Sequence, residues 1–260
     1  MKKNIGFVIF LLLISATVIS QDLSLYQKKY MVQGGDTLPY RLLLPKDYDS
    51  TKTYPVIFFL HGAGERGIDN QKQLVHGGKL FLKDEVRENY KAIVVFPQCP
   101  ADDYWGNMLR MHGDNEKRTF YFLEEGSPGK YMQLLQELVT YVLEKYPAKK
   151  DQVYVGGLSM GGMGTFELVK RMPKTFAAAF PICGGANPAT AKKLKKVNWW
   201  VFHGGKDDVV PPHHSENMVT ALKDVGAKVK FTLYPNANHN SWDSAFAEPD
   251  LLSWLFAQHK

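Results

Sequence analysis

The residue of this sequence best suited to chemistry is Ser159, in the segment GLSMG at 157–161. It follows a β-branched and apolar segment at 152–156 that predicts a short buried strand, and it precedes a helical pattern. The chain must reverse so sharply here that a side chain two residues before or after the serine would clash, which explains both glycines. Such a turn holds the hydroxyl at the strand tip, as a nucleophile requires. The alternative is a glycine-rich turn whose serine only caps the helix.

An acidic pair and a histidine follow the two strands predicted nearest the C-terminus. The acids are Asp207 and Asp208, and the histidine is His239. A serine hydroxyl becomes a good nucleophile when an imidazole removes its proton and a carboxylate orients that imidazole. The chain order serine, aspartate, histidine is the order of α/β-hydrolases. We therefore predict that Ser159 is a nucleophile, that His239 is its general base, and that one of the two aspartates orients the histidine.

Alternating strands and helices must position these residues. Two apolar stretches around a Gly-Gly-Asp turn at 29–45 predict an N-terminal hairpin. The alternation that follows predicts an α/β domain with a doubly wound, mostly parallel sheet, whose functional residues belong at the carboxyl ends of the strands. The strands are expected at 54–60, 92–96, 152–156, 176–182, 199–202 and 229–234, and the helices at 131–146, from the serine to Met172, and at 214–225.

A glycine-rich segment, HGAGERG at 61–67, follows the buried strand predicted at 54–60. Backbone amides are bare in such a loop and can bind an anion. The alternative is an ordinary turn between a strand and a helix.

From about residue 29 onward the chain resembles the α/β-hydrolase superfamily, and within it the secreted single-domain esterases grouped with polyhydroxybutyrate depolymerases, feruloyl esterases and prolyl-oligopeptidase-like hydrolases. The resemblance implies that Asp207, the first aspartate of G-x-x-D-x-x-V-P, is the triad acid, and that Asp208 is a loop or capping residue. It also implies an oxyanion hole formed by the amides of Met160 and Ala63. The matching segments are LHGAGERG at 60–67, GGLSMGG at 156–162, HGGKDDVVP at 203–211 and NANHNSW at 236–242.

The N-terminus predicts export. A short basic segment precedes an apolar stretch at 5–19, which is typical of a signal peptide over residues 1–20. The alternative is an uncleaved anchor, but the apolar stretch is at or below the ~17 residues that a membrane span needs. We expect a secreted or periplasmic protein without a membrane segment after signal removal, with residues 21–260 as a single domain.

Charge and ligand spacing argue against other classes of partner. The formal net charge is +6, but the lysines are dispersed, and the densest group, at 192–196, is typical of a solvated helix face. We expect no nucleic-acid partner, although an acidic polysaccharide could be attracted. His213 and His214 lie where a helix is predicted to begin, without a further ligand at metal-binding spacing. No metal or other cofactor is expected.

The two cysteines, Cys99 and Cys183, each follow an apolar segment that predicts a strand of the same sheet. With the usual strand order of this fold, two other strands lie between them. At ~4.8 Å per strand the cysteines would be ~14 Å apart, beyond the ~7 Å limit for a disulfide. We expect two buried free thiols; the alternative is a disulfide, since export favours oxidation.

Aromatic residues are candidates for holding the substrate. Trp105 lies in a long insertion at 101–130 that must pass over or beside the active-site face, and Trp242 lies three residues after His239. Aromatic rings there could hold a sugar or a cinnamoyl group. The alternative for the insertion is that its aromatic residues form a small core of their own.

Together these observations predict a secreted serine carboxylesterase that needs no cofactor and works through an acyl-enzyme. Its substrate is expected to be a small-molecule or polysaccharide ester, and acetyl and feruloyl esters of polysaccharides are the candidates. Two alternatives remain open. One is an exported serine peptidase of the prolyl-oligopeptidase type, and the other is a non-catalytic carbohydrate-binding protein with the same fold. The sequence does not indicate an oligomeric state.

Overall fold

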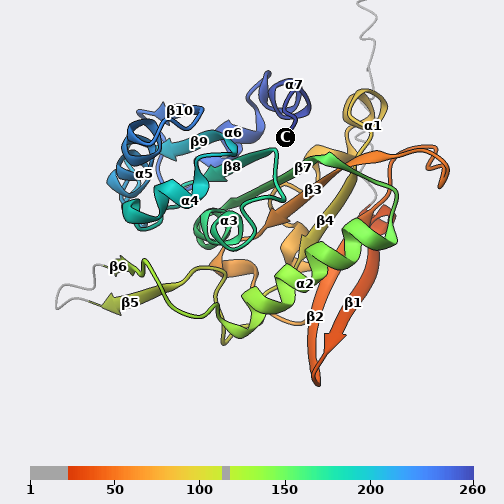
Figure 1. Ribbon diagram of the computed structural model, residues 1–260, viewed down its shortest axis with the longest axis horizontal. Coiled ribbons are helices and arrows are strands. Elements are labelled where there is room, and N and C mark those ends of the chain that lie inside the picture. The colour runs from red at the N-terminus through yellow and green to blue at the C-terminus, as the bar shows by residue number, and fades with distance from the viewer. Residues whose placement is uncertain (1–22, 113–117) are drawn as a thin grey trace, which may run out of the picture.

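The computed structural model describes residues 23–112 and 118–260 (Figure 1). The predicted signal peptide, 1–20, lies outside the described residues. No helix within the described residues is both long enough and apolar enough to span a membrane.

One eight-stranded sheet forms the centre of the molecule, in the order β1-β2-β4-β3-β7-β8-β9-β10. The hairpin β1–β2 is antiparallel, β2 pairs antiparallel with β4, and all later pairs are parallel. The predicted fold class, an α/β-hydrolase sheet with an N-terminal antiparallel hairpin, is therefore confirmed. The strands of this sheet are β1 (Gln27–Gln33), β2 (Asp36–Leu43), β3 (Tyr54–Leu60), β4 (Ile93–Pro97), β7 (Ala148–Leu158), β8 (Ala178–Ile182), β9 (Asn198–Gly204) and β10 (Val229–Tyr234).

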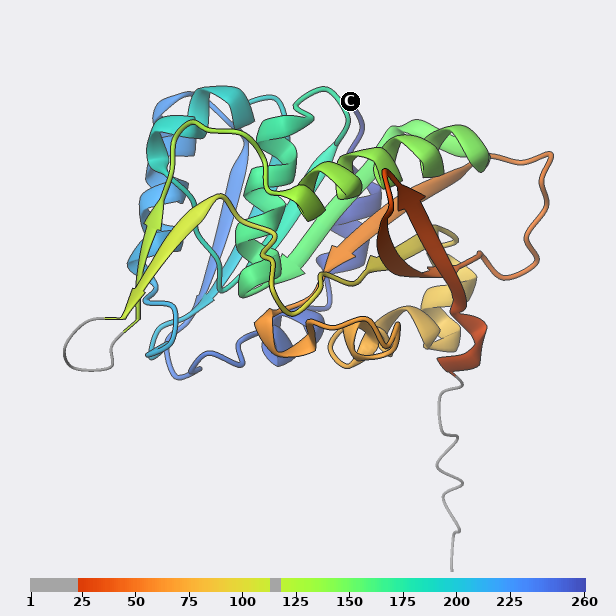
Figure 2. The same ribbon diagram turned by 90° about the horizontal axis from the view of Figure 1, so that it is seen from below.

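Helices cover both faces of the sheet, as the view from below shows (Figure 2). One face is covered by α2 (Lys130–Lys145), α3 (Met160–Arg171), α4 (Ala191–Leu194) and α5 (His213–Asp224). The other is covered by α1 (Asp84–Asn89), α6 (Trp242–Phe246) and α7 (Leu251–Phe256). Short 3₁₀ turns lie at Leu23–Leu25, Ala63–Glu65, Lys72–Leu74, Leu80–Leu82 and Pro188–Thr190.

The central strand β3 explains why the sequence pattern predicted this arrangement. Every residue of β3 is buried, and successive side chains point to opposite faces. Phe58 packs into the core beneath α2 and α3, whereas Phe59 packs into the core beneath α1 and α7. A strand buried on both faces needs a continuous apolar run, which is what this segment has. It is a rigid platform for the loop that follows it.

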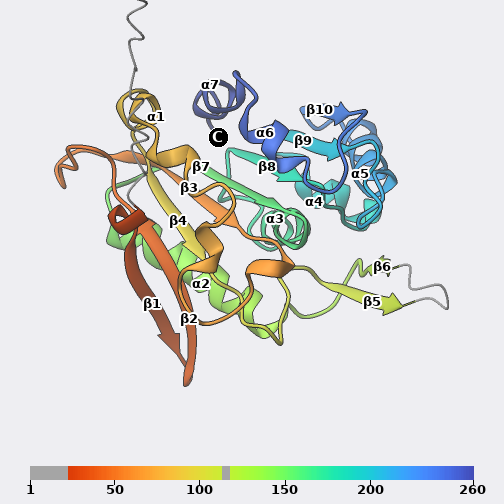
Figure 3. The same ribbon diagram turned by 180° about the vertical axis from the view of Figure 1, so that it is seen from behind.

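The insertion at 101–130 contains an antiparallel hairpin that the sequence analysis did not predict, formed by β5 (Met108–His112) and β6 (Arg118–Phe122). The view from behind shows this hairpin extending away from the central sheet (Figure 3). From the middle of β6, Phe120 packs against Met163 of α3 and Val210 of the loop after β9. The insertion therefore lies beside the elements that carry the serine and the acid.

The two cysteines are free and buried. The strands that precede them are β4 for Cys99 and β8 for Cys183, and β3 and β7 lie between these strands in the sheet. The prediction of two buried free thiols is confirmed, and so is the strand order on which it rested.

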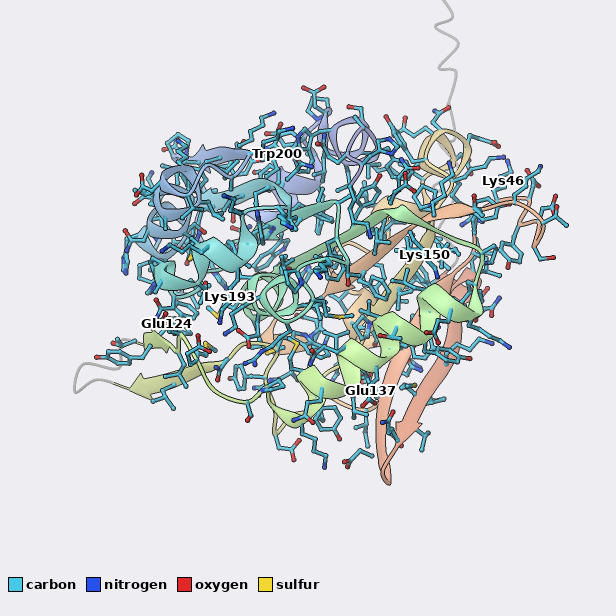
Figure 4. All side chains as sticks on the ribbon, in the orientation of Figure 1. Lys46, Glu124, Glu137, Lys150, Lys193 and Trp200 are labelled. Atoms are coloured by element: carbon cyan, nitrogen blue, oxygen red, sulfur yellow. The ribbon has the colours of Figure 1, made fainter. Side chains whose placement is uncertain are left out.

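The lysines labelled in Figure 4 come from three parts of the chain and lie apart on the outside of the molecule. Lys46 forms an ion pair with Glu88, and Lys193 forms one with Glu125 at 2.8 Å. Exposed ion pairs of this kind contribute little to stability. These lysines do not form a shared basic patch.

Candidate active site

Ser159 occupies a sharp turn between the end of β7 and the first residue of α3. Its φ of 52° and ψ of −116° lie outside the regions that residues with a side chain normally adopt. A Cβ on Gly157 would come within 2.4 Å of Gly161 O, and a Cβ on Gly161 within 1.9 Å of Leu60 O. Both glycines are therefore required by close backbone contacts, as the sequence predicted. The strain at the serine costs of the order of 1–3 kcal/mol.

The structure brings together Ser159, His239 and Asp207, which are far apart in the sequence. His239 Nε2 lies 2.9 Å from Ser159 Oγ, and His239 Nδ1 lies 2.8 Å from Asp207 Oδ2. Because the carboxylate can only accept, Nδ1 carries the hydrogen and Nε2 is left free to accept the serine proton. The histidine is thus in the tautomer that a general base needs.

Asp207 is held rigidly in the loop after β9. Its Oδ1 accepts hydrogen bonds from the amides of Val209 and Val210, each at 2.9 Å. Burial would raise the pKa of Asp207, but the hydrogen bonds from His203, His239 and the Val210 amide hold this pKa well below its usual range. The carboxylate is therefore ionised and can stabilise a positive charge on His239.

The neighbouring acid, Asp208, has a different environment. Its side chain is exposed, and its backbone amide donates to Asn238 Oδ1 at 3.3 Å. Of the two adjacent aspartates, Asp207 is therefore the one whose carboxylate hydrogen-bonds to His239.

A second histidine, His203 near the end of β9, also contacts Asp207, a role that was not predicted from the sequence. His203 is completely buried, and its Nε2 lies 3.2 Å from Asp207 Oδ2 and 2.8 Å from Val210 O. Since both of these atoms are acceptors, Nε2 carries a hydrogen and donates to them. Ser215 Oγ lies 2.7 Å from the other ring nitrogen. The sequence feature that could have indicated this contact is the position of His203, directly after the strand predicted at 199–202 and four residues before Asp207.

The amides expected to form an oxyanion hole lie at two adjacent turns. Met160 and Ala63 are the first residues of α3 and of the 3₁₀ turn 63–65, so neither amide has a hydrogen-bond partner within its own helix. Leu60 of β3 pairs in register with Gly157 of β7, which places these turns side by side. Among the described residues, neither amide donates to a protein acceptor. Both are available to an anion.

His61 fastens the glycine-rich loop to the end of β4. Its ring is buried, its Nδ1 lies 2.6 Å from Gly62 O, and its Nε2 accepts from the Cys99 amide at 3.0 Å. Burial lowers the pKa of His61 to about 4. The ring is neutral at neutral pH, with the hydrogen on Nδ1.

Because His61 is buried in its neutral form, we expect the free energy of unfolding to decrease as the pH falls. Between about pH 6.5 and about pH 4 the unfolded chain binds a proton at residue 61 and the folded chain does not, so the free energy of unfolding decreases as pH falls. The loss from His61 is about 3 kcal/mol. Urea unfolding across this window should show a smaller decrease for His61→Asn than for the wild type. The exposed His259→Asn variant should retain the wild-type decrease.

The two tryptophans proposed for substrate binding occupy different environments. Trp242 is partly exposed and its ring packs edge-on against His239, with centroids 5.4 Å apart. Trp105 is 0% exposed, and it packs on His61 and against Gly164 of α3. The expectation for Trp105 is corrected: its ring has no surface to offer a substrate, because the insertion uses it to anchor itself to the domain core.

The nucleophile turn and the order of the three residues along the chain are those of an α/β-hydrolase. A family model described as phospholipase/carboxylesterase matches residues 48–249, which include all of the residues discussed above as site candidates. The chain belongs to this family.

Individual relatives agree with this assignment. The chain is similar to a thermostable esterase of known structure, with 31% identity and a TM-score of 0.81 over 92% of this chain and 64% of that one. It is 25% identical to a probable carboxylesterase of Arabidopsis thaliana, over 71% of this chain and 72% of the relative. It is 29% identical to a bifunctional acetylxylan esterase/xylanase of Neocallimastix patriciarum, over 35% of this chain and 14% of the relative. The chain thus spans a small part of that last enzyme and slightly less than two thirds of the thermostable esterase.

Proposed function

We propose that this protein is a serine carboxylesterase that hydrolyses esters through an acyl-enzyme. The observation that carries the proposal is the continuous series of hydrogen bonds from Ser159 Oγ through both nitrogens of His239 to Asp207. Such a series activates a hydroxyl that is otherwise a poor nucleophile.

In the first half of the reaction, Ser159 Oγ attacks the ester carbonyl carbon while His239 Nε2 takes the hydroxyl proton. The resulting imidazolium is stabilised by Asp207, which is already ionised and cannot rotate away from Nδ1. The negative charge on the carbonyl oxygen is taken up by the amides of Met160 and Ala63. His239 then returns its proton to the leaving alcohol, and the acyl group stays on the serine.

In the second half, a water molecule takes the place of the alcohol. His239 removes a proton from this water, which attacks the acyl carbon, and the proton then passes to Ser159 Oγ as the acid leaves. Because the same nitrogen acts in both halves, the ring must keep its orientation. The edge-on contact with Trp242 and the hydrogen bond to Asp207 hold it.

For the substrate, we propose an ester carried by a polysaccharide or one of its fragments, with an acetyl or feruloyl acyl group. The support is the similarity to an enzyme described as an acetylxylan esterase and the export predicted from the N-terminal segment. We propose accordingly that the protein acts outside the cytoplasm, in secreted or periplasmic form. The partly exposed ring of Trp242 beside the histidine is the proposed contact for the substrate.

A panel of substrates tests this function. Acetyl, butyryl, octanoyl and feruloyl esters should be hydrolysed, with acetyl or feruloyl preferred, and amino-acyl anilides should not be cleaved. Cleavage of anilides with comparable kcat/KM would instead support the peptidase alternative. If no ester is turned over although the protein binds oligosaccharides, the carbohydrate-binding alternative is favoured. Against that alternative stands the strained backbone of Ser159, which a binding protein does not need.

A further inference from the structure

A thiol lies directly behind the hydrogen-bonded residues of the site. Cys183 is the first residue after β8, the strand between those that lead to Ser159 and to Asp207. Its sulfur, a carboxylate oxygen of Asp207 and a ring nitrogen of His239 all lie within 4.8 Å of one another. Among the described residues, this is the one group of three histidine, cysteine or acidic side chains with such spacing.

This group has the chemistry of a site for a thiophilic cation. Thiolate, imidazole and carboxylate are the ligands that Zn²⁺ uses, and three protein ligands with one water complete a common tetrahedral site. The Nδ1 and Oδ2 atoms that face each other are 2.8 Å apart. Ligand atoms on a tetrahedral Zn²⁺ are about 3.5 Å apart, so shifts of about 1 Å would bring all three donors into position.

The surroundings of the thiol also suit an ion. The Ser241 hydroxyl is completely buried beside the Cys183 sulfur and has no well-formed hydrogen bond to any described residue. It has no nitrogen or oxygen partner among the described residues and interacts with the sulfur of the cluster. Of the three candidate ligands, His239 is the one in contact with solvent, with 18% of its side chain exposed.

We propose that Cys183, Asp207 and His239 form an inhibitory binding site for Zn²⁺ and similar thiophilic cations. The ion replaces the proton between His239 Nδ1 and Asp207 Oδ2 and the proton of the Cys183 thiol. The imidazole proton moves to Nε2, so one proton, that of the thiol, is released to solvent for each Zn²⁺ bound. The ion's two positive charges are balanced by the thiolate and the carboxylate.

The consequence for activity follows from the new tautomer and rests on the proposed function. A hydrogen on Nε2 points at Ser159 Oγ, so the histidine can no longer accept the serine proton. The ion also occupies the carboxylate oxygen that would stabilise the imidazolium. Bound Zn²⁺ therefore prevents both Asp207 and His239 from acting in the reaction. A catalytic zinc, in contrast, activates water.

Titration calorimetry with Zn²⁺, in parallel with ester hydrolysis, tests the site. The wild type should bind one Zn²⁺ and lose activity in proportion, and a chelator should restore activity. In the absence of Zn²⁺, Cys183→Ala should keep its esterase activity. Its affinity for Zn²⁺ should fall by more than about 10- to 100-fold, which is the loss seen when a residue that only supports a metal ligand is removed. Cys99→Ala is the matched control, since Cys99 is equally buried and free, and it should behave as the wild type.

The Zn²⁺ site and the proposed esterase function can be tested separately. Ser159→Ala retains all three ligands, so it should bind Zn²⁺ with wild-type affinity although it cannot hydrolyse esters. Equal Zn²⁺ affinity of wild type and Cys183→Ala would overturn the site, as would the absence of binding to wild type. Cys183→Ser provides the same comparison if the alanine variant does not fold. A chain that binds Zn²⁺ through Cys183 but has no esterase activity would keep the site and refute the proposed function.

Discussion

Replacement of Ser159 by alanine is expected to lower kcat by about 10⁶-fold, the size of the loss when the nucleophile of a serine protease is removed. In the proposed mechanism the hydroxyl oxygen forms the acyl-enzyme, and among the described residues Ser159 Oγ is the hydrogen-bond partner of His239 Nε2. The effect should appear in kcat and not in folding, since alanine keeps the Cβ that this turn already accommodates.

Covalent labelling makes this expectation specific. A fluorophosphonate should modify wild type at one site, found by mass spectrometry at Ser159, and it should leave Ser159→Ala unlabelled. The matched control is Ser253→Ala, which removes an exposed hydroxyl and should preserve both labelling and activity. Labelling at another serine, or a Ser159→Ala variant with substantial activity, would contradict the assignment of the nucleophile.

The second large effect separates the two adjacent aspartates. Asp207→Asn should lower kcat by about 10⁴-fold, because an amide in this position can donate to Nδ1 and thus favour the wrong tautomer of His239. Asp208→Asn should lower kcat by less than about tenfold, because its side chain is exposed, whereas the carboxylate that hydrogen-bonds to His239 belongs to Asp207, and a surface polar contact has only a small effect.

The comparison requires both variants on one activated ester under identical conditions. Circular dichroism should give the same folded signal for each, so that a loss of kcat is not a loss of structure. If Asp208→Asn lost most of its kcat while Asp207→Asn kept a nearly wild-type kcat, the triad acid would be Asp208 and not Asp207.

Much of this architecture could be predicted from local sequence patterns. The continuous apolar run of β3 and the glycines on both sides of Ser159 report constraints that act within a few residues, namely burial on both faces and close backbone contacts. The positions of the acid and the histidine follow from the rule that functional residues gather at the carboxyl ends of parallel strands. These features needed no knowledge of tertiary packing.

Other features depend on contacts between distant segments and left little local signal. Cys183 was expected to be a buried thiol, but its position beside Asp207 and His239 depends on the register of three neighbouring strands. Trp105 was a candidate for binding the substrate, yet the insertion folds so that this ring is buried against His61. The β5–β6 hairpin was missed because its strands have only five residues each and pair with each other alone, apart from the central sheet.

The position of β10 at the edge of the sheet affects how the folded chain opens locally under mildly destabilising conditions. This strand pairs with β9 alone, and none of its residues is buried, whereas β7 is paired on both sides. The free energy of local opening is low where a segment loses hydrogen bonds to only one neighbouring strand and exposes little apolar surface. We expect opening at this edge to displace the loop after β10 that carries His239, whereas Ser159 follows β7, which is paired on both sides. The histidine proposed as the base therefore follows one of the two edge strands of the sheet, and we expect ester hydrolysis to be lost on opening of that edge before global unfolding.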